Sequence, residues 1–282
     1  MTAAPLGPSS PAALAPAALA FDAVAEGFDA RFGAWLSVAA QRRAVRAALA
    51  AAFPPGAHLL EIGGGTGEDA QWLLERGRRV LLTDPSPAMV RIAGAKLATY
   101  SDFAVAQAGA EDLEAFALRR EAAGAPRLDG AYSNFAGLNC VVDLAPFARG
   151  LARLVRPGAP VLLVVFGTAC PGEMVVEALR GRPSAMVRRL LQRGEAPARL
   201  GGRHFTVRYH RRTELIAALQ PWFAPAGRRG VGVFVPPSAA EPWISRHPAL
   251  LGALERLDRS LAGPLAAFGD HILYRFTRTE AA

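Results

Sequence analysis

The sequence predicts an α/β fold in which a parallel sheet carries helices on both of its faces. Over residues 58–166, short apolar segments alternate with segments of helical periodicity, and this alternation is typical of strands joined by crossover helices. The first apolar segment, HLLEI at 58–62, runs directly into the glycine-rich stretch GGGTG. A strand that ends in glycines before a helix favours close approach of the backbone to a ligand.

The N-terminal region divides into two parts. Residues 1–20 contain four prolines among alanines and lack a basic start, so we expect a disordered tail over 1–20 and no signal peptide. Residues 21–51 have helical spacing with aromatic side chains at Phe21, Phe28, Phe32 and Trp35, and Pro54-Pro55-Gly56 ends this helix.

The next elements form the core of the predicted sheet. Ser86 before Pro87 is typical of a helix N-cap, and Pro157-Gly158 ends the last of the helices. The predicted strands lie at 58–62, 79–83, 103–106, 128–133 and 160–166. The predicted helices lie at 68–76, 87–98 and 144–155.

The pattern changes after Phe166. Residues 170–203 are rich in arginine and glycine and have only weak helical patterns, at 173–179 and 185–191, so we expect an insertion over the sheet. The alternation then resumes with a strand at 205–209, a helix at 213–219 and a strand at 230–235. A second insertion with a helix at 249–261 follows, and a strand at 271–277 closes the chain. The predicted divisions are a core with an N-terminal helical lid at 21–166, a substrate cap at 167–205, and a core remainder at 206–282 that holds a second insertion at 236–269.

Composition limits the classes of function. The net charge is +8, and residues 170–232 contain twelve arginines against four glutamates, which fits a solvated surface, an anionic substrate or nucleic acid. No apolar run approaches the length of a membrane span. The two cysteines, Cys140 and Cys170, are too few for a disulfide framework. We therefore expect the protein to be located in a reducing cytoplasm. No CxxC or HExxH pattern occurs, and no metal site is predicted.

The spacing of the glycines discriminates between two ligand classes. The dinucleotide pattern G-x-G-x-x-G would need glycine at position 68, where the chain has Glu68. The pattern present is Glu61-x-Gly63-x-Gly65-x-Gly67, whose acid suits an ammonium group better than a pyrophosphate. Asp84 ends the next strand, at the place where a carboxylate accepts hydrogen bonds from ribose hydroxyls. S-adenosylmethionine is therefore favoured over NAD, with helix capping as the alternative role of Asp84.

Taken together, four segments carry a resemblance to a known family. They are LEIGGGTGEDA, LTDPSPAMV, LDGAYSNFAGLN and LARLVRPGAPVLLVVFG. With them the chain resembles the class I S-adenosylmethionine-dependent methyltransferases, in the style of the small-molecule (ubiquinone/menaquinone-type) enzymes. The resemblance covers residues 21–166, and 205–277 by topology only. It implies a Rossmann-like, doubly wound, seven-stranded sheet that is mostly parallel with one antiparallel strand.

The resemblance also implies roles for individual residues around S-adenosylmethionine. Glu61 would lie near the methionine ammonium, and Asp84 would bind the ribose. The family usually has an aspartate for the adenine amine where this chain has Gly109, so the Ala110 backbone or Glu111 would replace it. Phe28 would cover the sulfonium from the lid helix, with core packing as the alternative. The remaining contacts would come from Gly63, Gly65, Gly67, Pro85, Met89, Asn134 and Phe135.

Methyl transfer needs alignment and exclusion of water more than side-chain chemistry, and it needs a base only where the acceptor must lose a proton. The candidate bases are His204, which follows the expected cap, and Glu173, which begins it. Further candidates are His210, Tyr209 and His271. For each histidine the alternative is a surface or structural role.

The expected acceptor is a small organic molecule of amphipathic or acidic character, selected by the cap, with S-adenosylhomocysteine as the second product. An RNA or protein methyltransferase that uses the arginine-rich cap is an alternative. Ser133-Asn134-Phe135-Ala136 lacks the prolines expected of enzymes that methylate a base amine. A non-catalytic cofactor-binding protein is the third possibility. The acceptor atom and the oligomeric state stay open.

Overall fold

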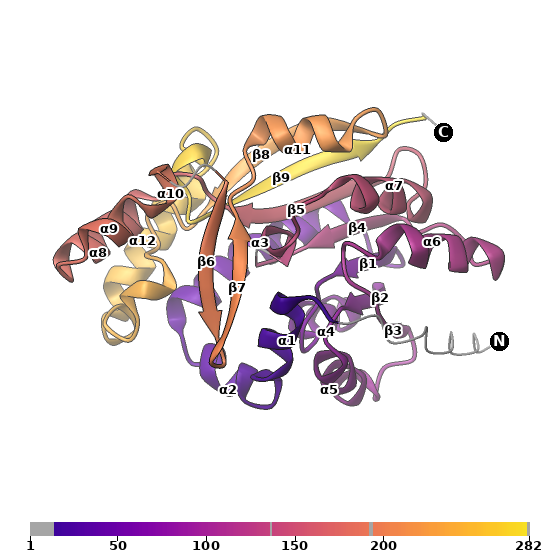
Figure 1. Cartoon of the computed structure of the whole chain (residues 1–282), viewed down its shortest axis with the longest axis horizontal. Helices are drawn as coiled ribbons and strands as arrows, with labels where there is room; N and C mark the ends of the chain where they lie inside the picture. Colours follow the sequence, from indigo (N-terminus) through magenta and orange to yellow (C-terminus); the bar gives the residue numbers. More distant parts are fainter. Residues whose placement is uncertain (1–13, 136, 192–193, 281–282) are drawn as a thin grey trace.

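The computed structural model describes residues 14–135, 137–191 and 194–280. A seven-stranded sheet with the order β3-β2-β1-β4-β5-β9-β8 forms its centre (Figure 1). Strand β9 is antiparallel to both of its neighbours, and the other adjacent pairs are parallel. The predicted α/β fold with one antiparallel strand is therefore confirmed. The strands are β1 His58–Ile62, β2 Arg79–Asp84, β3 Phe103–Gln107, β4 Gly130–Ser133, β5 Pro160–Phe166, β8 Phe223–Val231 and β9 His271–Arg278.

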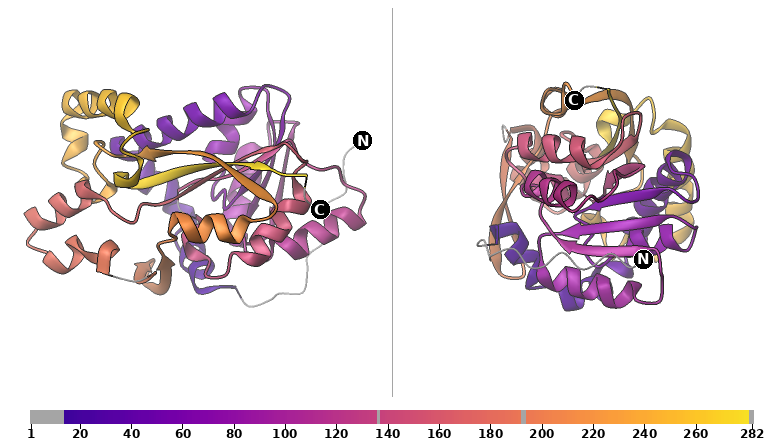
Figure 2. Two further views of the ribbon diagram at one scale, coloured as in Figure 1. Left: turned by 90° about the horizontal axis from the view of Figure 1, so that it is seen from above. Right: turned by 90° about the vertical axis from the view of Figure 1, so that its right-hand side faces the viewer.

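Helices cover both faces of this sheet (Figure 2). Successive side chains of a strand point to opposite faces, so Leu59 packs into one core and Leu60 and Ile62 pack into the other. The Leu59 core is covered by α3 Leu36–Ala52, α4 Glu68–Leu74 and α5 Pro87–Leu97. The Leu60 core is covered by α6 Leu113–Ala122, α7 Ala145–Leu154 and α11 Arg212–Leu219. Helix α6 was not predicted, although Leu113, Phe116 and Ala117 have helical spacing and are buried.

The N-terminal region differs from its prediction in two respects. The expected helix over 21–51 is broken into α1 Pro16–Asp22, the 3-10 helix η1 Ala25–Gly27, α2 Phe28–Gly33 and α3. The expected tail at 1–20 is wrong for its last residues, because α1 buries Ala18 and Ala20. Pro16 stands in the first turn of α1, where proline is tolerated, and so it does not interrupt the helix. Residues 1–13 of the expected tail lie outside the described residues.

The region after β5 forms three short helices and a separate hairpin. The cap helices are α8 Pro171–Leu179, α9 Pro183–Met186 and α10 Arg188–Leu191. The cap hairpin pairs β6 Glu195–Leu200 with β7 Arg203–Arg208 through Gly201-Gly202, both of which have positive φ. The prediction that the strand at 205–209 rejoins the main sheet is therefore wrong. The strand expected at 230–235 corresponds to β8, which begins earlier in the chain, at Phe223, and ends at Val231. Strand β8 is an edge strand of the sheet.

The second insertion packs on α3. It contains η3 Ser238–Ala240, η4 Ile244–Arg246, α12 Pro248–Leu261 and η5 Ala266–Phe268, while η2 Gly137–Cys140 follows β4. Ala40 of α3 shares a small core with Ile244 and Leu251. The Ser37 amide (3.0 Å) and hydroxyl (2.6 Å) both donate to Glu241. Within the described ranges, no helix is long and apolar enough to cross a membrane.

Candidate functional site

The glycine loop at 63–67 leaves the carboxyl end of β1, between β2 and β4. Strands β2 and β4 lie on opposite sides of β1 in the sheet. The loop therefore lies at the point where the strand order reverses, which is where open α/β sheets bind ligands. Gly63 and Gly65 have φ values of +69° and +54°, which side chains rarely adopt. A Cβ on Gly64 would lie 2.5 Å from the Leu82 side chain. Gly67 also has positive φ, and its Cα faces Ala93 of α5, so it allows α4 to pack closely on α5.

Glu61 is a buried carboxyl group beneath this loop. Its side chain is 3% exposed, and Oε2 has no hydrogen-bond partner among the described residues. Burial, together with the nearby Asp69 carboxylate, raises the pKa of Glu61 well above its usual range. The Tyr132 hydroxyl beside it opposes this rise only in part. A buried carboxyl group with an open acceptor oxygen is costly in the free protein and attracts a cationic group.

Asp84 lies at the end of β2, beside the loop. Its Oδ2 accepts the Gly65 amide at 2.9 Å, and its Oδ1 accepts the Ser86 amide at 2.9 Å. Each carboxylate oxygen has two lone pairs, so both can still accept a ligand hydroxyl. Burial raises the pKa of Asp84 against the effect of these two amides. Ser86, not Asp84, caps α5, because its hydroxyl accepts the Met89 amide at 3.1 Å.

The residues expected at the adenine gather beside Asp84. The Met89 side chain is buried, and a Cβ on Gly65 would lie 4.0 Å from its sulfur. A Cβ on Gly109 would lie 3.4 Å from Pro85 and 3.1 Å from the Glu111 carboxylate. Ala110 is buried next to them. The end of β2 and the turn after β3 thus lie side by side.

Asn134 and Phe135 directly follow β4. Asp69, which the sequence did not predict as a site residue, holds the Asn134 side chain in position. Asp69 is buried in the first turn of α4 and accepts from Asn134 (2.7 Å) and Arg46 (2.7 Å). The Asn134 side-chain oxygen accepts the Phe135 amide at 2.8 Å. Phe135 is the one residue other than glycine with positive φ in the described part of the chain, at +48°. Such strain collects at ligand sites. The only signal for Asp69 in the sequence is that two acidic residues, Glu68 and Asp69, directly follow the glycines.

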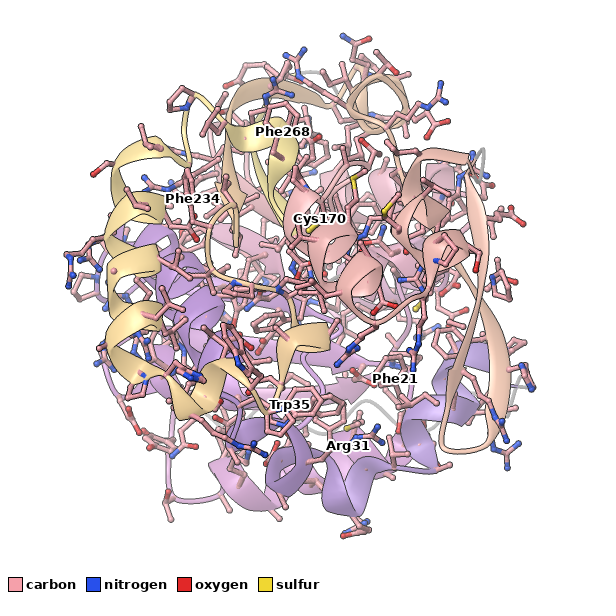
Figure 3. All side chains as sticks on the ribbon, turned by 90° about the vertical axis from the view of Figure 1, so that its left-hand side faces the viewer. Phe21, Arg31, Trp35, Cys170, Phe234 and Phe268 are labelled. Atoms are coloured by element: carbon pink, nitrogen blue, oxygen red, sulfur yellow. The ribbon has the colours of Figure 1, made fainter. Side chains whose placement is uncertain are left out.

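The N-terminal helices cover the loop. Asp29 of α2 accepts from the Thr66 hydroxyl (2.6 Å) and pairs with Lys96 of α5 (2.6 Å). Asp22 accepts from the Ser86 hydroxyl (2.6 Å). Phe28 is half-buried in a row of rings that begins at the cap hairpin and ends at Trp35. The row runs Phe205–Phe21–Phe28–Phe32–Trp35, with centroid separations of 6.0, 6.2, 4.7 and 5.0 Å. In Figure 3, Phe21 and Trp35 lie below the cap helix that follows Cys170.

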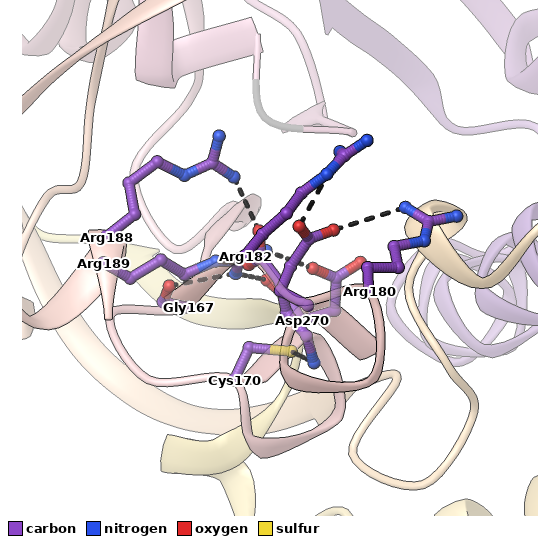
Figure 4. A network of polar contacts seen from close by, with 9 residues as sticks. Gly167, Cys170, Arg180, Arg182, Arg188, Arg189 and Asp270 are labelled. Carbon is purple, nitrogen blue, oxygen red and sulfur yellow. Dashed lines mark hydrogen bonds and ion pairs between the residues drawn. The ribbon is translucent and has the colours of Figure 1, made fainter. Parts of the chain in front are cut away.

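The two predicted bases lie apart from each other and in different surroundings. His204 is exposed on β7 of the cap hairpin, opposite Arg199. Glu173 is buried in α8 and forms ion pairs with Arg188 (2.6 Å) and Arg189 (Figure 4). Arg189 also forms an ion pair with Asp270 at 2.6 Å. This network therefore links the cap helices to the start of β9. His210 is buried behind them, with Nε2 3.1 Å from the Leu138 carbonyl.

His271 stands at the carboxyl edge of the sheet, next to these residues. It is the first residue of β9 and pairs in register with Phe166 at the end of β5. Its ring stacks on Phe166 at 4.9 Å and meets the Phe135 ring edge-on at 5.8 Å. Three rings thus lie together at the carboxyl ends of β4 and β5. The sequence placed His271 only behind His204.

The glycine loop fits S-adenosylmethionine. An ammonium group would meet the open Oε2 of the buried Glu61 carboxyl, and ribose hydroxyls would meet the remaining lone pairs of Asp84. Gly63 and Gly65 leave their outer faces without side chains. Among residues 14–135, 137–191 and 194–280, no cluster of three His, Cys, Asp or Glu side chains is arranged to hold a metal ion.

Comparisons with known proteins agree with this geometry. A family model described as a methyltransferase domain matches residues 35–221, which is more than half of the chain. No curated protein matches it.

Solved structures share the fold. The [4+2]-cyclase SpnF has a TM-score of 0.59 at 15% identity, over 96% of this chain and 98% of that one. The Burkholderia thailandensis 1,6-didemethyltoxoflavin-N1-methyltransferase, solved with its substrate and S-adenosylhomocysteine, has a TM-score of 0.55 at 20% identity, over 99% and 94%. A Mesorhizobium loti S-adenosylmethionine-dependent methyltransferase has a TM-score of 0.50 at 19% identity, over 82% and 96%. At such identities these structures establish the fold alone.

Proposed function

Since the chain belongs to the methyltransferase-domain family and is a class I S-adenosylmethionine-dependent methyltransferase, we propose that it methylates a small organic acceptor. The observation that carries this proposal is the packing of the cap against the Phe166 ring and against the N-terminal helices. The cap hairpin packs against Phe166, Arg189 of α10 lies over the Phe166 ring at 5.4 Å, and Phe205 of the hairpin contacts Phe21 of α1. A site that both the cap and the N-terminal helices flank suits a small molecule better than a polymer.

The chain's own residues would bind the cofactor at both of its ends. Glu61 would pair with the ammonium through its free oxygen, and Asp84 would accept the ribose hydroxyls. Pro85, Met89, Ala110 and Glu111 would enclose the adenine. The bound cofactor supplies a methyl group on a positively charged sulfur. Phe28, with the row of rings around it, would exclude water from that group.

The cap arginines favour this proposal over RNA methylation. Arg188 and Arg189 pair with Glu173, and Arg180 and Arg182 pair with Glu177. Their charge is thus partly neutralised within the cap. We propose that residues 167–208 form one acceptor-binding unit that includes the whole hairpin. Because both cysteines are free thiols, we also propose a reducing, cytoplasmic location.

A turnover screen tests the proposed function. The purified protein would be incubated with S-adenosylmethionine and a panel of small phenols, heteroaromatic N–H compounds, thiols, amines and carboxylic acids. Mass spectrometry would detect a product heavier by one methyl group. We expect turnover of at least one compound class. S-adenosylhomocysteine binding with no turnover of any class would overturn the proposal.

A salt titration separates the RNA alternative. Binding of a fluorescent single-stranded RNA would be measured over increasing salt, because each arginine–phosphate contact adds to the slope of log affinity against log salt. We expect weak binding with a shallow slope. Tight binding with a steep slope, together with methyl incorporation into RNA, would contradict the small-molecule proposal.

A further inference from the structure

His271 has the surroundings of an oriented base. It is 6% exposed, and its buried Nδ1 has no hydrogen-bond partner among the described residues. Nδ1 lies 3.4 Å from Asp270 Oδ2, so the carboxylate is placed to orient the imidazole. Nε2 is then the nitrogen left for a ligand. A nearly buried imidazole whose hydrogen bonds are incomplete is costly unless a ligand completes them.

Asp270 is itself held in place by two other elements. Gln41 of α3 donates to its Oδ2 at 3.1 Å, and Arg189 of α10 donates to its Oδ1 at 2.6 Å. Arg189 also donates to the carbonyls of Gly167 (3.1 Å) and Asp270 (2.7 Å). Asp270 therefore has a fixed position, and the side chain of His271 is bracketed by it and by the Phe166 ring.

The electrostatics keep the imidazole able to accept a proton. Burial lowers the pKa of His271, and the Arg189 cation lowers it further, against the opposing effect of Asp270. Glu173 of α8 is the other charged group of this network, and Arg189 lies between it and Asp270. A histidine with a lowered pKa is neutral at pH 7, as a general base must be.

We propose that His271 is the general base of the methyl transfer, and that its acceptor carries a weakly acidic O–H or N–H on a flat aromatic ring. The proposal rests on the proposed function and specifies its substrate class. The aromatic part follows from the rings that surround the imidazole. Phe135 and Phe166 flank it, and Tyr209 lies 5.9 Å from Phe166.

The acceptor O–H proton passes to His271 Nε2 while the oxygen electron pair forms the new bond to the methyl carbon. The bond between that carbon and sulfur breaks, and its electron pair stays on sulfur. The products are the methyl ether and S-adenosylhomocysteine, and the imidazolium later returns its proton to solvent.

A substituted phenol series tests this role. Initial rates would be measured for wild type and His271→Asn with phenols of falling pKa, from unsubstituted phenol to para-nitrophenol. A missing base should lower kcat by about 10²–10⁴-fold for the least acidic phenol, with little change in KM. The loss should shrink toward the nitrophenol, which is already ionised. In wild type, kcat should fall as the pH drops through the pKa of His271.

Two controls separate chemistry from folding. His247→Asn changes an exposed histidine of the second insertion and should leave every rate unchanged. Affinity for S-adenosylhomocysteine should be equal in wild type and His271→Asn. An equal loss across the whole phenol series would overturn the proposal, because a structural defect does not depend on acceptor acidity.

The acceptor classes that are methylated also test the proposed role of His271. Turnover of non-aromatic acceptors alone would overturn this inference and leave the proposed function standing. If no compound is methylated, the proposed function fails, and the spectrum of para-nitrophenol with the protein and S-adenosylhomocysteine decides the inference. Phenolate absorption raised by wild type but not by His271→Asn would support the base. No such difference, or no binding, would overturn it.

Discussion

Glu61 links cofactor binding to pH. A carboxyl group whose pKa is raised in the folded protein stabilises the fold below its unfolded pKa, and that stability is lost as pH rises through the folded pKa. Ammonium binding favours the ionised form, so binding should release a proton at pH values below the pKa of Glu61 in the free protein. The free protein should therefore lose stability as pH rises, and the ligand should restore it.

Calorimetry with S-adenosylhomocysteine, in two buffers of different ionisation enthalpy, checks this prediction. We expect proton release and rising affinity with pH in wild type. Glu61→Gln should bind about 10–150-fold more weakly where the acid is ionised, and its affinity should vary less with pH. An unchanged affinity in a folded Glu61→Gln protein would show that the free oxygen of Glu61 does not meet the ligand.

Asp84 should contribute to ribose binding beyond its backbone contacts. Asp84→Asn removes one acceptor and should cost about 1.5–3 kcal/mol of cofactor binding, or roughly 10–150-fold in Kd. Asp129 is the matched control, because its Oδ2 accepts the His58 amide at 2.8 Å at the amino end of β1. Asp129→Asn should leave the affinity unchanged. Equal affinities in both variants would assign Asp84 to the backbone turn alone.

At the scale of elements, Arg189 should be the main anchor of the cap helices. Its side chain is 8% exposed and joins Glu173 to Asp270. Arg189→Met would leave two buried carboxylates without their shared partner, and we expect a loss of about 3–5 kcal/mol in the free energy of unfolding. Chemical denaturation measures this loss.

Arg182→Met is the comparison for that variant. Its guanidinium lies 3.9 Å from Glu177 and is 64% exposed, so it should cost under about 1 kcal/mol. Similar losses in the two variants would mean that the network does not fasten the cap.

The elements that the sequence predicted are those with a strong burial pattern. Strands β1, β2 and β5 are almost wholly buried, and apolar runs reveal them. Strand β8 is an edge strand whose middle residues are exposed, and β6 and β7 pair only with each other, so hydrophobicity could not place them. Helix α6 has a buried face of only three residues, which its charged residues obscure.

The candidate site follows the same division. Glu61, the glycines and Asp84 are close in sequence to the strand ends that position them, so their spacing alone is enough to predict them as candidates. Asp69, His271 and the Arg189 network depend on contacts between distant elements. Asp270 meets Gln41 across 229 positions and Arg189 across 81, and no local pattern encodes such contacts.

At the scale of the whole molecule, the sheet order places the predicted cofactor residues of β1, β2 and β4 at the same ends of these strands. The carboxyl ends of β1, β2 and β4 bring Glu61, Asp84 and Asn134 together, and the N-terminal helices and the cap lie over them (Figure 1). The antiparallel strand β9 begins at this same edge, which is how His271 reaches the site from the end of the chain.

Calorimetric titration of the purified protein with S-adenosylhomocysteine, with NAD as the control ligand, tests the central claim most directly. The geometry predicts binding of S-adenosylhomocysteine with a Kd in the micromolar range and no heat of binding for NAD. Binding of NAD alone, or of neither ligand by a folded protein, would contradict the roles given to Glu61, the glycine loop and Asp84.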